Sequence, residues 1–238
     1  MGAFYLGVLF MKLRNPFANL NGFEWTLYIL SAVTVIVTGV FGGGDGVLST
    51  VASFIGVTAL IFVAKGDVFG QILTLVFSVF YGIISYSFNY YGEMITYMCM
   101  TAPIALASVV SWIRHPFKDT DEVEVATLSH RNVAFMWVAT IVVTVAFYFI
   151  LGAFGNANLL VSTVSVTTSF LASYLTFFRS PYYALAYAAN DIVLIALWIM
   201  ASLSDIKYIA MVVCFIAFFA NDMYGFYNWK RMQKRQGR

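Results

Sequence analysis

The chain has 238 residues, of which 61% are hydrophobic, 18% aromatic and only 10% charged, and its mean hydropathy is +0.84. Soluble domains carry about 25% charged residues, so this composition excludes a soluble enzyme and a nucleic-acid-binding protein and predicts an integral membrane protein. The formal net charge of +2 comes from 13 basic and 11 acidic side chains and does not indicate an anionic partner.

Residues 1–23 precede the first long apolar segment and are expected to be cytoplasmic or interfacial. Met1–Met11 is apolar but too short to cross a bilayer. Lys12 and Arg14 follow this apolar run, whereas the positive charges of a signal peptide precede it. We therefore predict an interfacial helix or a disordered lead.

Apolar segments of about the length that a helix needs to span a bilayer then follow one another along the chain. They cover residues 24–41, 47–64, 68–88, 95–112, 133–151, 159–178, 182–203 and 208–229. We interpret Gly42–Gly46 as a tight turn rather than a phosphate-binding loop, because no Lys followed by Ser or Thr comes after the glycines. The sequence thus predicts an all-α integral membrane protein with eight transmembrane helices.

Basic residues gather on one side of this scheme. An even number of spans places both termini and every second connection on the same face, and that face holds all the Lys and Arg residues except Lys207. The basic tail, residues 230–238, belongs to it. Because cytoplasmic connections are enriched in Lys and Arg, we predict that both termini are cytoplasmic.

The longest connection, residues 113–131, contains both histidines, His115 and His130. A metal site is conceivable there, but the two histidines are far apart on a segment rich in charges. A solvated cytoplasmic linker is the favoured interpretation, and no metal is predicted.

The ends of the segments repeat along the chain. The second segment ends in Phe62–Gly66 and the fourth at Trp112, which is followed by a basic residue. The sixth segment ends in Thr176–Ser180 and the eighth at Trp229, again followed by basic residues. Helices two to four therefore match helices six to eight, with Lys65 aligned to the arginine of the second turn.

This match predicts a one-plus-three-plus-one-plus-three order of helices. Residues 47–112 and 159–229 would form two parallel three-helix repeats, with 133–151 as the linker helix that restores the orientation and 24–41 as an additional helix. Parallel repeats are one of the transporter plans, with the substrate site near the midplane between them. A chance match between apolar helices is the alternative.

Acids are rare at membrane depth. Asp191 and Asp222 lie well inside spans, and each follows an asparagine, Asn190 or Asn221. The spans hold no Lys, Arg or His, which excludes a retinal-type Schiff base and leaves any proton relay to carboxylates alone. We expect Asp222 to reach water or to cap a neighbouring helix near the cytoplasmic end, so that Asp191 is the candidate for ion coupling or for bonding ligand hydroxyls.

Helical spacing sorts the other polar residues into faces. Gln71 and Tyr81 belong to one polar stripe of the third segment, and Tyr187, Asp191 and Trp198 share a face of the seventh. Serines of the sixth segment are assigned to helix packing. Tryptophans near helix ends are expected at the membrane interfaces; these are Trp25, Trp112, Trp137 and Trp229.

Together these residues predict a substrate site. Aromatic faces with a few neutral hydrogen-bonding groups suit a flat-ringed ligand with several hydroxyls, such as a nucleoside or a heteroaromatic vitamin. The candidate binding residues are Asn190, Asp191, Trp198, Asn221, Gln71, Tyr187 and Tyr81. No catalytic motif is present, and neither cysteine has a His partner in its span, so no enzyme activity, cofactor or nucleic-acid partner is predicted.

The C-terminal run Gly225–Lys230, preceded by Asn221–Tyr224, resembles the C-terminal signature of the PnuC-type vitamin transporters. Other segments that resemble this family are Phe178–Tyr182, Asn190-Asp191 and Val63–Gly66. The resemblance runs from about Trp25 to Trp229.

The resemblance implies a relative of the SWEET sugar transporters that assembles as a homotrimer in the bacterial inner membrane. It implies facilitated diffusion (uniport) of nicotinamide riboside, which a cytosolic kinase then traps by phosphorylation. Many members have a Gln directly after the Pro of the fourth span, where this chain reads Pro103–Leu106 without one. Thiamine and deoxynucleoside carriers therefore stay alternatives, and a non-transporting receptor or membrane subunit is the alternative outside transport.

Overall fold

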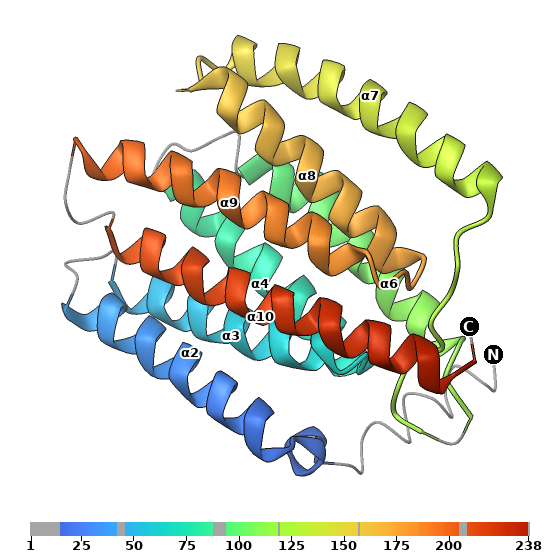
Figure 1. Cartoon of the computed structure of the whole chain (residues 1–238). Coiled ribbons are helices and arrows are strands. Elements are labelled where there is room, and N and C mark those ends of the chain that lie inside the picture. The colour runs from blue at the N-terminus through green and yellow to red at the C-terminus, as the bar shows by residue number, and fades with distance from the viewer. Residues whose placement is uncertain are drawn as a thin grey trace.

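The structure is a computed structural model that describes residues 15–41, 46–87, 94–118, 120–156, 158–204 and 209–237. The described part is a bundle of long helices (Figure 1). Three sequence predictions, the lead over residues 1–14, most of the glycine turn and the position of Lys207, lie outside the described residues.

The helices of the bundle follow the apolar segments of the sequence. They are α2 (Gly22–Phe41), α3 (Gly46–Ala64), α4 (Val68–Ser87), the π-helical η2 (Thr96–Thr101), α6 (Ala102–Ile113), α7 (His130–Ala153), α8 (Leu159–Phe177), α9 (Tyr183–Ser202) and α10 (Ile209–Arg235), after a short 3-10 turn, η1 (Pro16–Asn19). Within the described residues, six helical stretches are long and apolar enough to cross a membrane. The prediction of an all-helical, multi-pass membrane protein is confirmed.

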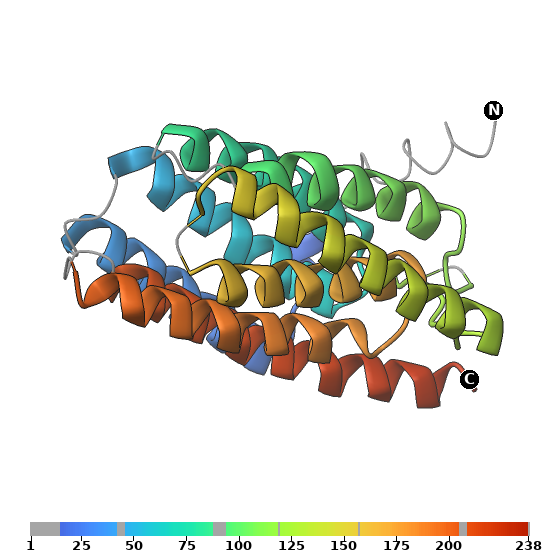
Figure 2. The ribbon, with the colours of Figure 1, turned by 90° about the horizontal axis from the view of Figure 1, so that it is seen from above.

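Six of these helices pack in a closed ring. Helix α3 packs on α4, α4 on α6, α6 on α8, α8 on α9, α9 on α10, and α10 on α3 again. The remaining two lie outside it at opposite edges of the bundle, α2 against α3 and α10, and α7 against α8 (Figures 1 and 2). The ring therefore joins the triplet α3, α4 and α6 to the triplet α8, α9 and α10 along two seams.

The first helix of each triplet ends in the same kind of turn. Gly66 after α3 and Arg179 after α8 have φ angles of 70° and 56°, and each donates its N–H to the carbonyl three residues earlier. The next residue, Asp67 or Ser180, bonds the carbonyl five residues earlier, which completes a Schellman motif. The structure thus aligns Gly66 with Arg179, one residue away from the sequence match with Lys65, because the left-handed residue fixes where each helix ends.

Trp112 and Trp229 are buried at the seams between the triplets, with 1% and 0% of their surfaces exposed. Trp229 Nε1 donates to the Val63 carbonyl at 2.9 Å, Trp112 Nε1 donates to the Thr176 carbonyl at 3.0 Å, and the two ring systems lie 5.4 Å apart. The predicted interfacial position is therefore wrong for this pair. The last carbonyls of a helix lack partners within the helix, so they provide buried acceptors for the indole N–H groups.

The linker between α6 and α7 is packed against the bundle, in contrast to the predicted solvated segment. Val123 and Val125 are buried in the same apolar cluster as the tryptophan pair. The amide of Val123 donates to the carbonyl of Gly66, and that of Ala126 donates to the carbonyl of Arg179. One extended segment thus contacts both equivalent turns.

Candidate functional site

Two buried carboxyl groups lie on the neighbouring helices α9 and α10. Asp191 of α9 and Asp222 of α10 are each 4% exposed, and these two helices pack against each other. The prediction that Asp222 reaches water is wrong. Helix α10 continues to Arg235, beyond the predicted end at Trp229, so that Asp222 lies deeper in a helix that packs against α9 and α3.

Two tyrosines of α9 lie one and two helical turns before Asp191. Tyr187 lies 3.4 Å from Ser173, measured between their hydroxyl oxygens, and Tyr183 packs edge-on against Trp229 at 4.9 Å between ring centres. The Tyr183 hydroxyl occupies the space beside Gly225, where a Cβ atom would come within 3.0 Å of it. Sequence reasoning missed Tyr183, although it is one helical turn from Tyr187.

Asn190 is buried but faces α8. Its Oδ1 accepts hydrogen bonds from Ser165 at 3.1 Å and from Thr168 at 2.9 Å. A small cleft of about 20 Å³, close to the volume of one water, borders Ser165 and Leu194. The Asn190 carbonyl oxygen thus joins α8 to α9, and it points away from the neighbouring acid Asp191.

Asn221 joins α10 to the additional helix α2. Its Nδ2 donates to Ser31 Oγ and to the Ala217 carbonyl, both at 2.8 Å. Its Oδ1 is buried without a hydrogen-bond partner among the described residues, and so is Asp191 Oδ2. Buried polar atoms without partners are costly and mark places where water or a ligand completes the hydrogen bonding.

The remaining predicted residues lie elsewhere in the ring. Gln71 and Tyr81 are buried on α4, in the first triplet, and Tyr81 packs on Tyr97 of η2 at 4.4 Å between ring centres. Trp198 is buried in the apolar core that also contains Phe218 of α10. Of the predicted residues, Tyr187 and Asp191 lie one turn apart on α9, and the Tyr187 hydroxyl contacts Ser173 of α8.

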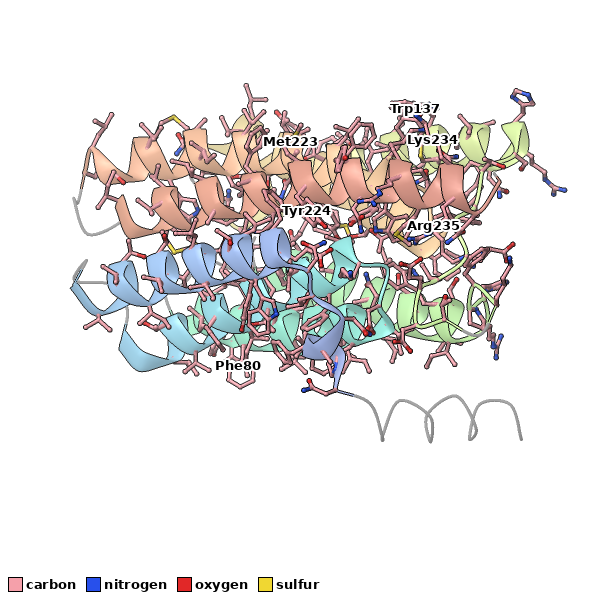
Figure 3. The ribbon with its side chains drawn as sticks, turned by 60° about the horizontal axis from the view of Figure 1, so that its bottom comes forward. Phe80, Trp137, Met223, Tyr224, Lys234 and Arg235 are labelled. Atoms are coloured by element: carbon pink, nitrogen blue, oxygen red, sulfur yellow. The ribbon has the colours of Figure 1, made fainter. Side chains whose placement is uncertain are left out.

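A third buried acid, Glu24, was missed by sequence reasoning. Its Oε2 accepts from Lys65 Nζ at 3.1 Å and from the Asn21 N–H at 2.7 Å, while its Oε1 accepts from the Tyr224 hydroxyl. Tyr224 lies between α10 and α2 (Figure 3). An Asn followed three residues later by Glu is a capping signal, but here the capping carboxylate also ties α2 to α3 and α10.

Basic side chains lie at the end of the bundle where α10 ends, as Lys234 and Arg235 illustrate (Figure 3). Arg179 donates from Nη1 to Ser111 Oγ at 2.9 Å and from Nε to the Glu124 carbonyl at 3.1 Å. Burial lowers the pKa of this guanidinium. Its bonds hold the turn after α8 against α6 and the linker, so this cation is used in packing.

Known transporters resemble this chain along most of its length. A protein of Neisseria mucosa named nicotinamide riboside transporter PnuC is 26% identical to this chain, and the match covers 93% of this chain and 86% of the relative. A protein of Haemophilus influenzae with the same name is 23% identical, and the match covers 80% of this chain and 82% of the relative. The crystal structure of the vitamin B3 transporter PnuC matches with a TM-score of 0.79 at 25% identity, covering 92% of this chain and 94% of that chain.

The family comparison covers the ring of six helices and the helix α7. A family model described as nicotinamide mononucleotide transporter matches residues 46–231. Since this match includes both triplets and the acids Asp191 and Asp222, the chain belongs to the nicotinamide mononucleotide transporter family.

Proposed function

We propose that this protein carries nicotinamide riboside across the bacterial inner membrane by facilitated diffusion. The observation that carries the proposal is the presence of buried polar groups on α9 and α10, where Asp191 Oδ2 and Asn221 Oδ1 have no hydrogen-bond partners among the described residues. The names of the relatives support the substrate. The mode is uniport, with trapping of the substrate by a cytosolic kinase.

We propose that eight helices cross the membrane as two parallel, SWEET-like repeats with two additional helices, and that both termini are cytoplasmic. The ring and the equivalent turns support the repeat. So do matching hydrogen bonds, since Ser111 of α6 donates to the Phe177 carbonyl and Asn228 of α10 donates to the Ala64 carbonyl. The asymmetric distribution of Lys and Arg supports the orientation.

The proposed substrate contacts are the residues predicted from the sequence together with Asp222. An aromatic face binds the ring of the ligand, and amide and carboxyl groups bind its ribose hydroxyls and carboxamide. The proposed set is Asn190, Asp191, Trp198, Asn221, Gln71, Tyr187, Tyr81 and Asp222.

Counterflow in liposomes tests the proposal. Purified protein should exchange labelled nicotinamide riboside without any ion gradient, stop at equal concentrations on both sides, and ignore collapse of pH or sodium gradients. Protein-free liposomes are the control. Accumulation above the external level without a kinase inside would contradict uniport and make Asp191 the coupling site. An absence of flux despite ligand binding would favour a receptor.

Thiamine and deoxynucleosides are the alternative substrates, because the segment Pro103–Leu106 lacks the glutamine found in many members. Competition of each compound against labelled nicotinamide riboside in the same liposomes ranks the three. We also propose a homotrimer on the basis of the family resemblance, which cross-linking in membranes and the mass of the purified particle would test.

A further inference from the structure

Glu24 of α2 is bonded to both triplets of the ring. Its Oε2 atom accepts a hydrogen bond from Lys65 Nζ at 3.1 Å, and Lys65 directly follows α3 of the first triplet. Its Oε1 atom accepts a hydrogen bond from the hydroxyl of Tyr224, which belongs to α10 of the second triplet (Figure 3). Only 1% of the surface of Glu24 is exposed. The two oxygens of one buried carboxylate therefore link the two triplets.

The first turn of α2 fixes the position of this carboxylate. The Asn21 N–H donates to Glu24 Oε2 at 2.7 Å, and the Asn21 side chain accepts the Glu24 N–H at 3.0 Å. This reciprocal pair is a capping box. A carboxylate accepts hydrogen bonds and does not donate them, and the three partners of Glu24 are all donors. The link is thus built from α2, which lies outside the ring.

Two other polar contacts of α2 each reach one triplet. The hydroxyl oxygens of Tyr28 and Thr58 of α3 lie 3.2 Å apart. Ser31 Oγ accepts a hydrogen bond from Asn221 of α10 at 2.8 Å. Helix α2 therefore lies along the seam between α3 and α10. Of these contacts, the Glu24 carboxylate is the one that bonds both sides of the seam.

Opening of this seam at the end where α10 ends requires a bond to Glu24 to break. Lys65 and Tyr224 belong to different triplets, so the triplets cannot move apart here while both bond the same carboxylate. The helices are in close contact beside the link, since a Cβ atom at Gly225 of α10 would lie 3.6 Å from the Cβ atom of Ala64 of α3. Hydrogen bonds to charged groups are stronger than neutral ones, so the link favours the closed seam.

We infer that Glu24 is a positioning residue for transport, which holds the α3–α10 seam closed at the end of the bundle where α10 ends. This inference rests on the proposed function, because a carrier exposes its site to the two sides of the membrane in turn. Loss of either bond to Glu24 disconnects the triplets and shifts the population toward the arrangement that is open at this end.

A buried cysteine at the seam reports its opening. Ala64→Cys is introduced into a chain whose own cysteines are replaced by Cys99→Ser and Cys214→Ala. Because Ala64 is 1% exposed, a maleimide reacts with the new thiol only when the seam opens. In purified protein without any ligand, Glu24→Gln should raise the labelling rate by about 10- to 100-fold, the effect of losing a hydrogen bond between charged groups.

Two controls separate opening of the seam from a general loosening of the fold. Ala172→Cys places the reporter on α8 at a residue that is 0% exposed, and Glu24→Gln should leave its labelling rate unchanged. Tyr28→Phe removes a hydroxyl of α2 that contacts Thr58 of the first triplet, and it should leave the labelling of Ala64→Cys unchanged. Equal increases at both reporters, equal increases with Tyr28→Phe and Glu24→Gln, or no increase with Glu24→Gln would overturn the inference.

A double variant tests whether the two bonds act as one link. Tyr224→Phe removes the bond to the second triplet and keeps the bond between Glu24 and Lys65, so it should increase labelling of Ala64→Cys as Glu24→Gln does. The double variant should show no further increase, because either single change already disconnects the triplets. Additive effects would indicate two independent contacts and overturn the inference. If Glu24→Gln does not fold, Tyr224→Phe gives the answer at the same reporter.

Transport assays distinguish this inference from the proposed substrate. Labelling requires no ligand, so a failure of nicotinamide riboside exchange would contradict the proposed function while an increase in labelling would still support the link at Glu24. In counterflow, Glu24→Gln should change the rate of exchange and keep the wild-type order in which nicotinamide riboside, thiamine and deoxynucleosides compete. A changed order would place Glu24 at the substrate and overturn its role as a positioning residue.

Discussion

Trp112 and Trp229 show how a single polar atom decides the position of a large side chain. Near a helix end either residue could lie at the membrane interface, and both are instead buried because the ends of α8 and α3 offer carbonyl acceptors to their indole N–H groups. Each tryptophan comes from one triplet and bonds the other. These two hydrogen bonds therefore hold the triplets together.

Replacing Trp229 with Phe tests this role. Trp229→Phe keeps an aromatic ring but removes the indole donor, so that the Val63 carbonyl keeps only its bond from the Gly66 N–H. The loss of this hydrogen bond should lower the free energy of unfolding by about 0.5–1.5 kcal/mol. Trp112→Phe should have a similar effect at the Thr176 carbonyl. Chemical unfolding in detergent measures both. Trp137→Phe is the control, since Trp137 is exposed, and equal losses in all three variants would contradict the prediction.

Asn221 offers a test of the site itself. Asn221→Leu removes the buried Oδ1 and should weaken binding of nicotinamide riboside by about 5- to 150-fold, the effect of leaving a ligand group unpaired in a dry site. Ser31→Ala is the matched control, because it deletes the bond to Asn221 Nδ2 and keeps Oδ1. Binding titrations compare them. Unchanged affinity in a folded Asn221→Leu variant would remove Asn221 from the site.

At the scale of the elements, close contact between α3 and α4 depends on one glycine. A Cβ atom at Gly70 would lie 2.4 Å from the backbone nitrogen of Val63 and 2.8 Å from the carbonyl carbon of Phe62. Gly70→Ala should therefore push the two helices apart and lower the free energy of unfolding by about 1–3 kcal/mol. Gly22→Ala, where no atom lies within 4 Å, is the control in the same unfolding assay, and equal effects would contradict the prediction.

The sequence predicted the helices well because a membrane span is recognised from its length and hydrophobicity. It did not predict the burial of Asp222, because that burial depends on how α10 is rotated about its axis. It also did not predict that Ser165 and Thr168 of α8 bond the Asn190 carbonyl oxygen. Neighbouring residues of a helix point about 100° apart, so Asn190 and Asp191 cannot both face the same seam.

The packed linker had a signal that the charge pattern obscured. Val123 and Val125 alternate with Glu122 and Glu124, and such alternation is typical of an extended segment with one buried face. The acids and histidines of the connection instead favoured a solvated segment. The buried valines show that the alternation was the better guide.

For the whole molecule, the distribution of basic residues makes a prediction about orientation. A reporter fused after Arg238 should be active in the cytoplasm, and one inserted at Asn156, between α7 and α8, should be active on the opposite side. The physical reason is that Lys and Arg are retained on the cytoplasmic face. Paired enzyme reporters measure this in intact cells. Finding both positions on the same side would contradict the eight-span arrangement.

The linker between α6 and α7 makes opening of one end of the molecule directly measurable. Its Val123 and Ala126 amides donate to the Gly66 and Arg179 carbonyls, one in each triplet. The triplets cannot separate at this end while both hydrogen bonds hold, so at least one of the two amides must be released. The rate of deuterium uptake at these two amides therefore reports whether this end of the molecule is open. The exchange is slow while this end is closed, and it is faster when a ligand shifts the population toward the state that is open on that side.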